Sequence, residues 1–267
     1  MTRSHAIGRI DILGVPVSTT GLGGAVAAIE DIILRHGREY VCITGAHGVI
    51  ESRRDARLQA IHEDAGLVTA DGMPVVWLAR ALGARETRRV YGPDLMKALT
   101  ELSARRGYRQ FYYGGAPGVA DKLASELIRR NPGLKVVGTI CPPFRPLMPA
   151  EDDAVVDAIN RSDADIVWIG LSTPKQEYWM AEHRRRLNAP VLVGVGAAFD
   201  FLSGSKRQAP RWMQRSGLEW LFRLLVEPRR LWRRYAVIVP SFALLAFRRW
   251  AAATFRLGHG SPPAAIR

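Results

Sequence analysis

The residues best suited to chemistry in this chain sit in five loops, each directly after a predicted strand. The loops hold Thr44 to His47, Asp71-Gly72, Gly114 to Gly118, Ser172 to Glu177 and Ala197 to Asp200. In a parallel α/β sheet the carboxyl ends of the strands share one edge, and ligands bind there. We therefore expect five loops that are distant in sequence to form one cleft.

Asp71 follows the predicted strand Leu67–Thr69, and Gly72 leads into a predicted helix that begins near Met73. A carboxylate at a strand end can act as a general base that takes a proton from an attacking hydroxyl group. The same carboxylate can instead cap the first turn of the helix. Position alone leaves both roles open.

The run Gly114 to Gly118 joins a predicted strand to a predicted helix. Glycines allow the backbone to approach an anion closely, and a helix N-terminus supplies amide donors. GxGxxG and GK[ST] are both absent, so this is neither a dinucleotide fingerprint nor a P-loop. Gly114, Gly115 and Gly118 are candidates for phosphate or nucleotide binding, and a tight structural turn is the alternative.

The loop that begins at Ser172 carries Pro174, which suits a first helical turn, where its missing N–H costs nothing. Lys175 and Gln176 would then point toward the cleft, one as a cation and the other as both donor and acceptor. Lys175 could equally be a solvated surface residue. His47 is the one histidine that we expect at the ligand edge.

No metal site is expected. Asp163-Ala164-Asp165 has the form of a metal-binding DxD, but it precedes a predicted strand and so belongs to the opposite edge of the sheet. The six histidines show no HxH or HxxxH spacing. No GxSxG elbow and no Cys-His pairing supports covalent hydrolase chemistry, and no cofactor is expected.

Strand-like runs alternate with helical stretches, which predicts right-handed βαβ units in a Rossmann-like, mostly parallel sheet flanked by helices. The predicted strands are Arg9–Val17, Tyr40–Thr44, Leu67–Thr69, Gln110–Tyr113, Lys135–Thr139, Asp165–Gly170 and Val191–Val195. The predicted helices are Gly24–Arg35, Val49–Glu63, Met73–Leu82, Asp94–Arg105, Val119–Arg130, Glu151–Asn160 and Lys175–Leu187.

The composition is that of a globular protein, with 267 residues, 48% hydrophobic and 24% charged. Two cysteines, Cys42 and Cys141, give no disulfide framework, and Cys42 lies in an apolar run where we expect a buried thiol. No apolar segment precedes Arg9, so we expect no secretory signal.

The net charge of +13 is concentrated near the C-terminus. Residues 206–256 contain twelve Lys and Arg against two acids, a net charge of +10. Such a block attracts nucleic acid, acidic lipid head groups or a diphosphate. We expect an α/β catalytic domain over 1–204, a basic, Trp- and Arg-rich helical appendage over 205–257, and a disordered tail over 258–267.

Residues 235–247 form a run of thirteen uncharged residues that contains Pro240 and is bracketed by arginine pairs. A spanning helix needs roughly twenty apolar residues, so the run reads as too short and as broken by the proline. An interfacial segment on an anionic membrane surface fits better. The alternatives are a helix packed on the protein's own core or at a homo-oligomer interface.

Six ordered motifs across residues 10–235 resemble the WecG/TagA/CpsF family, glycosyltransferase family 26. The matching stretches are Thr69 to Met73, Arg89 to Leu95, Phe111 to Gly118, Trp168 to Glu177, Gly194 to Phe201, and Gly217 to Leu224 continuing to Tyr235.

The resemblance implies inverting, metal-independent transfer of a sugar from a UDP donor to a polyprenyl-diphosphate-linked sugar, at the cytoplasmic face of the membrane. The product class is a cell-surface polysaccharide of exopolysaccharide, capsule or teichoic acid type. The family's proposed base falls on Asp71, and two further catalytic positions fall on Thr44 and Gln176. The appendage is expected to close over the cleft, with its arginines on the acceptor diphosphate. These are Arg223, Arg229, Arg230 and Arg234. The candidates for binding the nucleotide sugar are Gly114, Gly115, Gly118, Lys175, Asp200 and His47.

Two departures bear on the donor sugar. Many family members carry TxN where this chain has Thr44-Gly45-Ala46-His47, and many carry Arg-Ala-Pro where it has Gln208-Ala209-Pro210. The N-acetylmannosamine specificity best known in the family is therefore not assigned, and a glucosyl or other hexosyl donor is an equal alternative.

Two other functions remain as alternatives. A nucleotide-linked oxidoreductase could use the same sheet, but its dinucleotide fingerprint is missing. A non-enzymatic polyanion-binding protein could use the basic appendage. Its arginines interleave with Leu, Trp and Phe as in an interface-seeking helix, and no nucleic-acid reading motif is present, so nucleic acid is not the expected partner.

Overall fold

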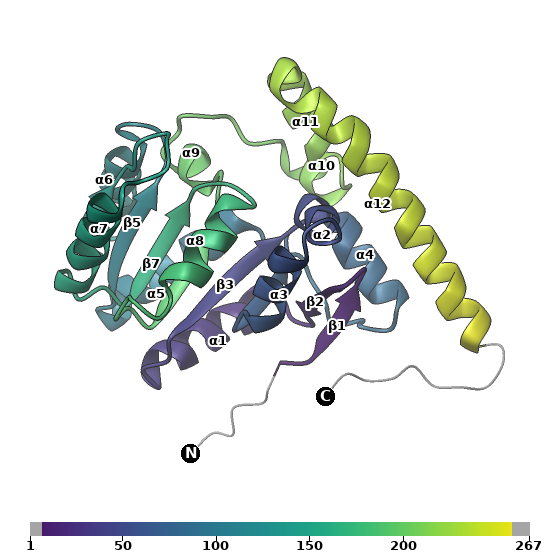
Figure 1. Cartoon of the computed structure of the whole chain (residues 1–267), viewed down its shortest axis with the longest axis horizontal. Helices are drawn as coiled ribbons and strands as arrows, with labels where there is room; N and C mark the ends of the chain where they lie inside the picture. The colour runs from purple at the N-terminus through teal and green to yellow at the C-terminus, as the bar shows by residue number, and fades with distance from the viewer. Residues whose placement is uncertain (1–6, 258–267) are drawn as a thin grey trace.

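A computed structural model describes residues 7–257. The predicted α/β class is confirmed: six strands form one sheet in the order β4-β3-β8-β7-β5-β6, and every pairing in it is parallel (Figure 1). The strands are β3 (Glu39–Thr44), β4 (Leu67–Ala70), β5 (Arg109–Gly114), β6 (Lys135–Ile140), β7 (Ile166–Gly170) and β8 (Val191–Gly194). Their carboxyl ends therefore lie along one edge.

Helices cover both faces of the sheet, which explains why the central strands are continuous apolar runs rather than alternating ones. Two hydrophobic clusters, one on each face, hold the layers together. One face carries α1 (Leu22–Leu34), α5 (Gly92–Arg106), α6 (Val119–Arg130) and α9 (Ala198–Leu202). The other carries α2 (Ala46–Ser52), α3 (Ala56–Asp64), α4 (Met73–Ala81), α7 (Pro149–Arg161) and α8 (Lys175–His183).

The single N-terminal strand predicted over Arg9–Val17 is wrong. The segment folds as an antiparallel hairpin of β1 (Arg9–Ile12) and β2 (Val15–Ser18). Leu13 and Gly14 turn the chain with φ of 56° and 95°, the left-handed values of a tight hairpin turn. The hairpin lies beside the edge strand β4, where Ser18 Oγ accepts the N–H of Val68 at 3.2 Å.

The helix predicted over Val49–Glu63 is two helices, α2 and α3. The break occurs at Asp55, whose carboxylate accepts the backbone N–H groups of Arg57 and Leu58 and so caps α3. Splitting the helix leaves α2 short and sets it directly after β3, at the edge where the loops gather.

The basic appendage is helical, as predicted, with α10 (Arg211–Arg215), α11 (Glu219–Val226) and α12 (Pro228–Leu257). The expected break at Pro240 is wrong, because α12 runs straight through it. The proline leaves one helical carbonyl without its donor. Burial of Ile238 and Phe242 on either side of it stabilises the continuous helix.

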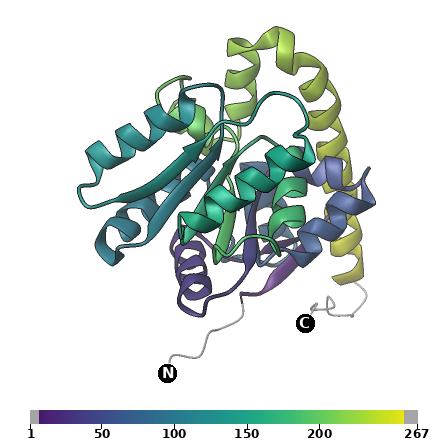
Figure 2. The ribbon, with the colours of Figure 1, turned by 60° about the vertical axis from the view of Figure 1, so that its left-hand side comes forward.

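The appendage arches over the end of the sheet toward which the strand arrows point, and α12 then descends along the side of the body against α2 and α4 (Figure 2). Within Pro228–Thr254 the most apolar 18-residue stretch has a mean hydropathy of 1.4, so α12 is long and apolar enough to cross a membrane by length and composition. Only 11% of its most apolar stretch is buried. The tail predicted over 258–267 lies outside the described residues.

Candidate functional site

Three hollows lie in a row at the carboxyl edge of the sheet. A wide groove of about 1310 Å³ is followed by a central pocket of about 160 Å³ and an apolar pocket of about 660 Å³. Ser172 and Gly196 line both the wide groove and the central pocket, whereas His47, Asp71 and Arg223 line both the central pocket and the apolar pocket. The central pocket therefore connects the other two.

The central pocket confirms the predicted convergence of loops in large part. Its walls include residues from the loops after β3, β4, β7 and β8. The fifth loop, after β5, opens on the wide groove instead. Among the predicted site residues, His47, Asp71 and Gln176 meet in the central pocket with Arg223 and Arg234.

The wide groove holds the predicted nucleotide-binding residues Gly115, Lys175 and Asp200. Lys175 is the first residue of α8, with Nζ 5.1 Å from the centre of the Phe144 ring. Asp200 Oδ2 is 3.2 Å from Lys206 Nζ. The groove is lined by acidic and basic side chains together: Asp152, Asp153, Glu182 and Asp200, and Arg145, Lys175, Arg186 and Lys206.

Gly114 and Gly118 shape the glycine loop without lining the groove. Gly114 has φ of 124°, and a Cβ there would lie 2.7 Å from the backbone of Gly170 on the neighbouring strand. Gly118 is the N-cap of α6 with φ of 77°. Only glycine adopts these conformations without strain, so the loop is held close to β7 with Gly115 facing the groove.

Asp71 is not the cap of α4, because the N-cap is Gly72. Its backbone N–H donates to the Thr44 carbonyl at 3.0 Å, which extends the β3–β4 pairing by one residue. The side chain is about one-third exposed (35%) and lines two of the three hollows. Its Oδ1 atom is buried and has no hydrogen-bond partner among the described residues.

The charges around Asp71 suit a carboxyl that titrates near neutrality. Burial raises the pKa of Asp71 to about 6; Arg89 opposes that rise and Glu219 adds to it. Arg89 Nη2 lies 3.6 Å from Asp71 Oδ1 but is hydrogen-bonded to Glu219. The arginine is therefore shared, and Asp71 receives only part of its charge.

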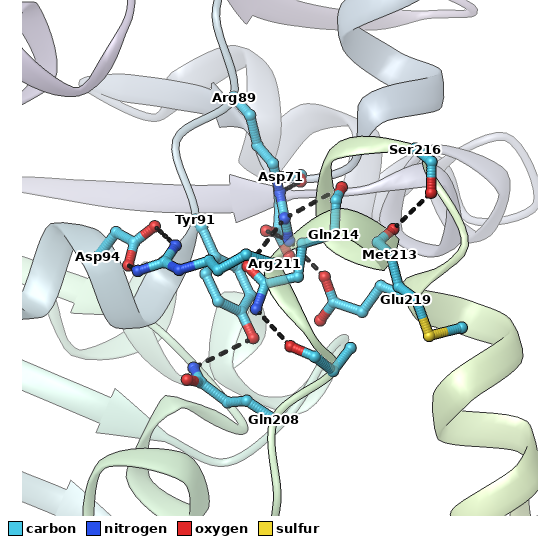
Figure 3. A network of polar contacts seen from close by, with 11 residues as sticks. Asp71, Arg89, Tyr91, Asp94, Gln208, Arg211, Met213, Gln214, Ser216 and Glu219 are labelled. Atoms are coloured by element: carbon cyan, nitrogen blue, oxygen red, sulfur yellow. Dashed lines mark hydrogen bonds and ion pairs between the residues drawn. The ribbon is translucent and has the colours of Figure 1, made fainter.

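Arg89 ties the β4 loop to the appendage (Figure 3). Its Nε donates to the Asp71 carbonyl at 2.8 Å, and its guanidinium lies 4.1 Å from the centre of the Tyr91 ring. Glu219, the first residue of α11, completes the bridge. The sequence analysis assigned no role to Arg89 or Glu219, because neither follows a predicted strand. Both lie in stretches that match the family's motifs, and that match could have marked them as candidate site residues.

Gln176 is buried beside the central pocket. Its Nε2 donates to Glu177 Oε1 at 3.1 Å, an oxygen that also accepts from Thr173 Oγ1 at 2.9 Å. Its Oε1 has no hydrogen-bond partner among the described residues. Because buried acceptors are normally paired, this oxygen is available to a ligand donor.

Thr44 does not line any of the three hollows. Its hydroxyl lies 2.9 Å from His62 Nε2, while His62 Nδ1 is 2.9 Å from the Leu58 carbonyl. That carbonyl can only accept, so Nδ1 carries the proton and the Thr44 hydroxyl donates to Nε2. The structure turns this predicted catalytic side chain away from the cleft and leaves its carbonyl to hold Asp71.

The predicted arginines divide into two pairs. Arg223 lines the central and apolar pockets and Arg234 lines the central pocket. Arg230 pairs with Glu227 at 2.6 Å, and Arg229 is exposed and lines none of the three hollows. Burial and the two inward arginines lower the pKa of His47 to about 4, so this histidine is neutral at pH 7.

The apolar pocket lies between α4 and the appendage. Trp77 forms one wall, and Phe242 and Trp250 of α12 form part of the other. Gly217, in the turn before α11, packs directly on Trp77, since a Cβ there would lie 2.7 Å from the Trp77 ring. The pocket exists only because the appendage packs against the α/β body.

The remaining predictions concern residues outside these hollows. Asp163 and Asp165 lie at the opposite edge of the sheet, as predicted, and both pair with Arg109. Within residues 7–257 no group of three His, Cys, Asp or Glu side chains is arranged to hold a metal ion. Gln208, one of the departures, donates to the Tyr91 hydroxyl at 3.4 Å, and Cys42 is buried as predicted.

Comparisons with known proteins agree on one family. The model of the glycosyl transferase WecG/TagA/CpsF family matches residues 10–255. A Bacillus spizizenii protein named N-acetylglucosaminyldiphosphoundecaprenol N-acetyl-beta-D-mannosaminyltransferase is 31% identical over 192 residues, 72% of each chain. A protein of the same name from Bacillus subtilis (strain 168) is 30% identical over 181 residues, 68% of each chain.

Proposed function

The chain belongs to the WecG/TagA/CpsF glycosyltransferase family, and we propose that it moves a hexosyl or N-acetylhexosaminyl unit from a UDP-sugar to a polyprenyl-diphosphate-linked sugar. The product class is a precursor of a cell-surface polysaccharide. The observation that carries this proposal is the position of Asp71, a carboxyl of raised pKa between a groove with cationic side chains and an apolar pocket. Neither an oxidoreductase nor a passive polyanion binder needs that arrangement.

The wide groove is suited to the UDP part of the donor. Gly115 brings the backbone close to a bound anion, and Lys175 and Lys206 supply positive charge. Asp200 can accept hydrogen bonds from ribose hydroxyls. The sugar then extends into the central pocket, where the unpaired Gln176 Oε1 is available to one of its hydroxyl groups.

Transfer proceeds by direct displacement. Asp71 accepts the proton of an acceptor hydroxyl, whose oxygen bonds to the anomeric carbon as the bond from that carbon to UDP breaks. Attack from the face opposite UDP inverts the anomeric configuration. Thr44 acts through Asp71 as a positioning residue, because its carbonyl holds the Asp71 backbone.

The acceptor diphosphate is neutralised by Arg223 and Arg234, which reach the central pocket from the appendage. The charge that a divalent cation offsets in other sugar transferases is that of the departing nucleotide diphosphate; here Lys175 and Lys206 in the wide groove can offset it, so activity is expected to survive a chelator. The neutral His47, which lines the same central pocket as the two arginines, can accept a hydrogen bond without adding charge.

The appendage is proposed to meet the cytoplasmic face of the membrane. Exposed Val237 and Leu244 give α12 an apolar outer surface, and Arg229 at its start would face the charged lipid head groups. The same surface could pair two copies of the chain. Flotation on anionic vesicles, combined with light scattering of the free protein, distinguishes membrane docking from self-association.

The test is UDP release by purified protein over a panel of UDP-sugars, including UDP-N-acetylmannosamine and UDP-glucose, with a prenyl-diphosphate-linked N-acetylglucosamine acceptor and a chelator present. We expect acceptor-dependent release with one donor, and an inverted anomeric configuration in the product by NMR. Folded protein that releases no UDP with any donor and acceptor pair would overturn the proposal. Activity only after addition of a divalent cation would overturn metal independence.

A further inference from the structure

The apolar pocket has no role in the donor chemistry. It shares no lining residue with the wide groove, and it extends from Asp71 along the inner side of α12. Its volume of about 660 Å³ lies within the range of pockets that bind small-molecule ligands. A pocket of this size beside a reacting carboxylate needs an occupant.

The two ends of the apolar pocket differ in polarity. Its inner end carries charged side chains, among them Asp71, Arg89 and Arg223. Farther along α12 the lining is apolar and includes Ala243, Ala246, Phe247 and Trp250. A ligand that matches this pattern has an anionic head next to the arginines and a hydrocarbon chain leading away from them.

The outer lining also leaves large aromatic side chains exposed to solvent. Phe247 is 61% exposed, Trp77 is 48% exposed and Trp250 is 44% exposed, although all three line the same pocket. Large aromatic side chains left in water along a continuous surface are typical of a binding site for an apolar ligand. Burying them gains free energy in proportion to the area removed from water.

We propose that the apolar pocket binds the first isoprene units of the acceptor's polyprenyl chain, as a subsite separate from the arginines that hold its diphosphate. The assignment rests on the proposed function for the identity of the chain. The lipid enters between α4 and α12, its diphosphate stops at Arg223, and its sugar hydroxyl reaches Asp71. The rest of the chain continues toward the membrane that the outer face of α12 contacts.

A matched pair of substitutions on one helix tests this subsite. Ala243→Trp fills the apolar pocket, since Ala243 lines it and is exposed. Ala252→Trp is the control: Ala252 is also exposed, lines none of the three hollows, and lies nine residues farther on, half a turn around α12. Thermal melting of each variant verifies that it folds. Ala246→Leu, a smaller change in the same lining, replaces Ala243→Trp if that variant melts early.

Binding is measured by calorimetry with two probes, farnesyl diphosphate and inorganic diphosphate. The wild-type protein is expected to bind farnesyl diphosphate at least tenfold more tightly. Ala243→Trp should lose about tenfold for farnesyl diphosphate and less than twofold for inorganic diphosphate, and Ala252→Trp should change neither. Equal affinity of the wild type for both probes, an equal loss for both in Ala243→Trp, or the same loss in Ala252→Trp would overturn the subsite.

Because these probes carry no sugar, the result does not depend on turnover. If UDP release fails with every substrate pair while farnesyl diphosphate still binds in the pocket, the proposed transfer is wrong and the lipid subsite stands. If transfer is observed but Ala243→Trp binds farnesyl diphosphate normally, the transfer stands and the lipid lies elsewhere.

Discussion

The wide groove and the apolar pocket meet the same central pocket but are built in different ways. The wide groove is formed by the loops after β5, β6, β7 and β8 and by residues of α7 and along α8, with Lys206 as its contribution from the appendage. The apolar pocket has one wall on α4 and the other on α10 to α12. One hollow is fixed by the sheet, and the other forms only where the appendage packs on the body.

Under the proposed function, this difference assigns the two substrates to two parts of the chain. Donor recognition would then depend on strand ends that are held by the hydrophobic clusters on the sheet faces. Acceptor recognition would depend on contacts such as that of Arg89 with Glu219, which connect the body to α11. Changes in the sheet loops should therefore alter donor kinetics, and changes in the appendage should alter acceptor kinetics.

The largest effect on transfer is expected at Asp71, in the central pocket where the two hollows meet. Asp71→Asn removes the base but keeps the size of the side chain, so kcat should fall by about 10³-fold, within the range of general-base contributions. UDP binding, measured by calorimetry, should change less than twofold because the wide groove is untouched. Turnover within tenfold of the wild type would remove Asp71 as the base.

The next effect separates the inward and outward arginines. Arg223→Gln should reduce kcat/KM for the acceptor by roughly 10–100-fold, the loss of a charge-assisted contact to a diphosphate. The donor KM should stay within twofold. Arg229→Gln is the matched control, and we expect it to leave transfer from a soluble acceptor unchanged because Arg229 lines none of the hollows. Equal losses in both variants would contradict the placement of the diphosphate.

On the sheet side, Lys175→Gln should raise the donor KM by about tenfold through loss of one cation near the UDP phosphates. The acceptor KM should not move. Lys122→Gln serves as the control, since Lys122 is an exposed residue of α6 that lines no described hollow. A rise in the acceptor KM instead would mean that the wide groove does not bind the donor and that the two substrates are assigned to the wrong hollows.

A smaller effect concerns the pH dependence of transfer. With the pKa of Asp71 near 6, the base is ionised above that pH, and the rate should fall tenfold per unit below it. Asp71 is faced by Arg89 and Arg223, which favour its ionised form, and by Glu219, which opposes it; His47 in the same pocket is neutral.

Glu219→Gln removes the opposing charge and frees Arg89 for Asp71. The acid limb of the pH–rate profile should then move down by roughly half to one pH unit. A purely structural role for Glu219 would lower the rate at all pH values and leave the limb in place. Measuring kcat/KM from pH 4.5 to 8 distinguishes these outcomes.

The smallest effect is on stability. A raised pKa means that the folded protein binds the Asp71 proton more tightly than the unfolded chain. This stabilisation is fully present below pH 4 and is lost as pH rises through about 6. Asp71→Asn should therefore be more stable than the wild type at pH 8, by about 1 kcal/mol after allowance for the partly exposed side chain, and no more stable at pH 4. Urea unfolding at both pH values measures the difference.

Much of the fold could be predicted because a sheet covered by helices on both faces has continuous apolar strands, which are easy to recognise in the sequence. Strands β3 to β8 are short apolar runs bounded by turn residues, and each was expected to within one residue of its bounds. The errors share a cause. The β1–β2 turn, the α2–α3 break and the continuity through Pro240 each depend on one local contact or on tertiary packing, which hydrophobic periodicity does not report.

The site was predicted where the strand end alone determines position. Asp71 reaches the central pocket because it directly follows β4, and Gln176 reaches it from the first turn of α8, the helix that follows β7. Thr44 sits at the last position of β3, where the side-chain direction depends on strand register, and it points to His62. Arg89 and Glu219 are 130 residues apart, and only the docking of the appendage brings them together.

Because the wide groove and the apolar pocket have no lining residue in common, the proposed donor and acceptor would each have their own entrance. Neither molecule would then have to pass the other to reach Asp71, and the two products would depart independently, UDP to water and the glycosylated lipid sideways into the proposed membrane contact. The expected kinetic scheme is random-order binding. A bound lipid product can then remain in the membrane-side entrance while a fresh donor fills the opposite one.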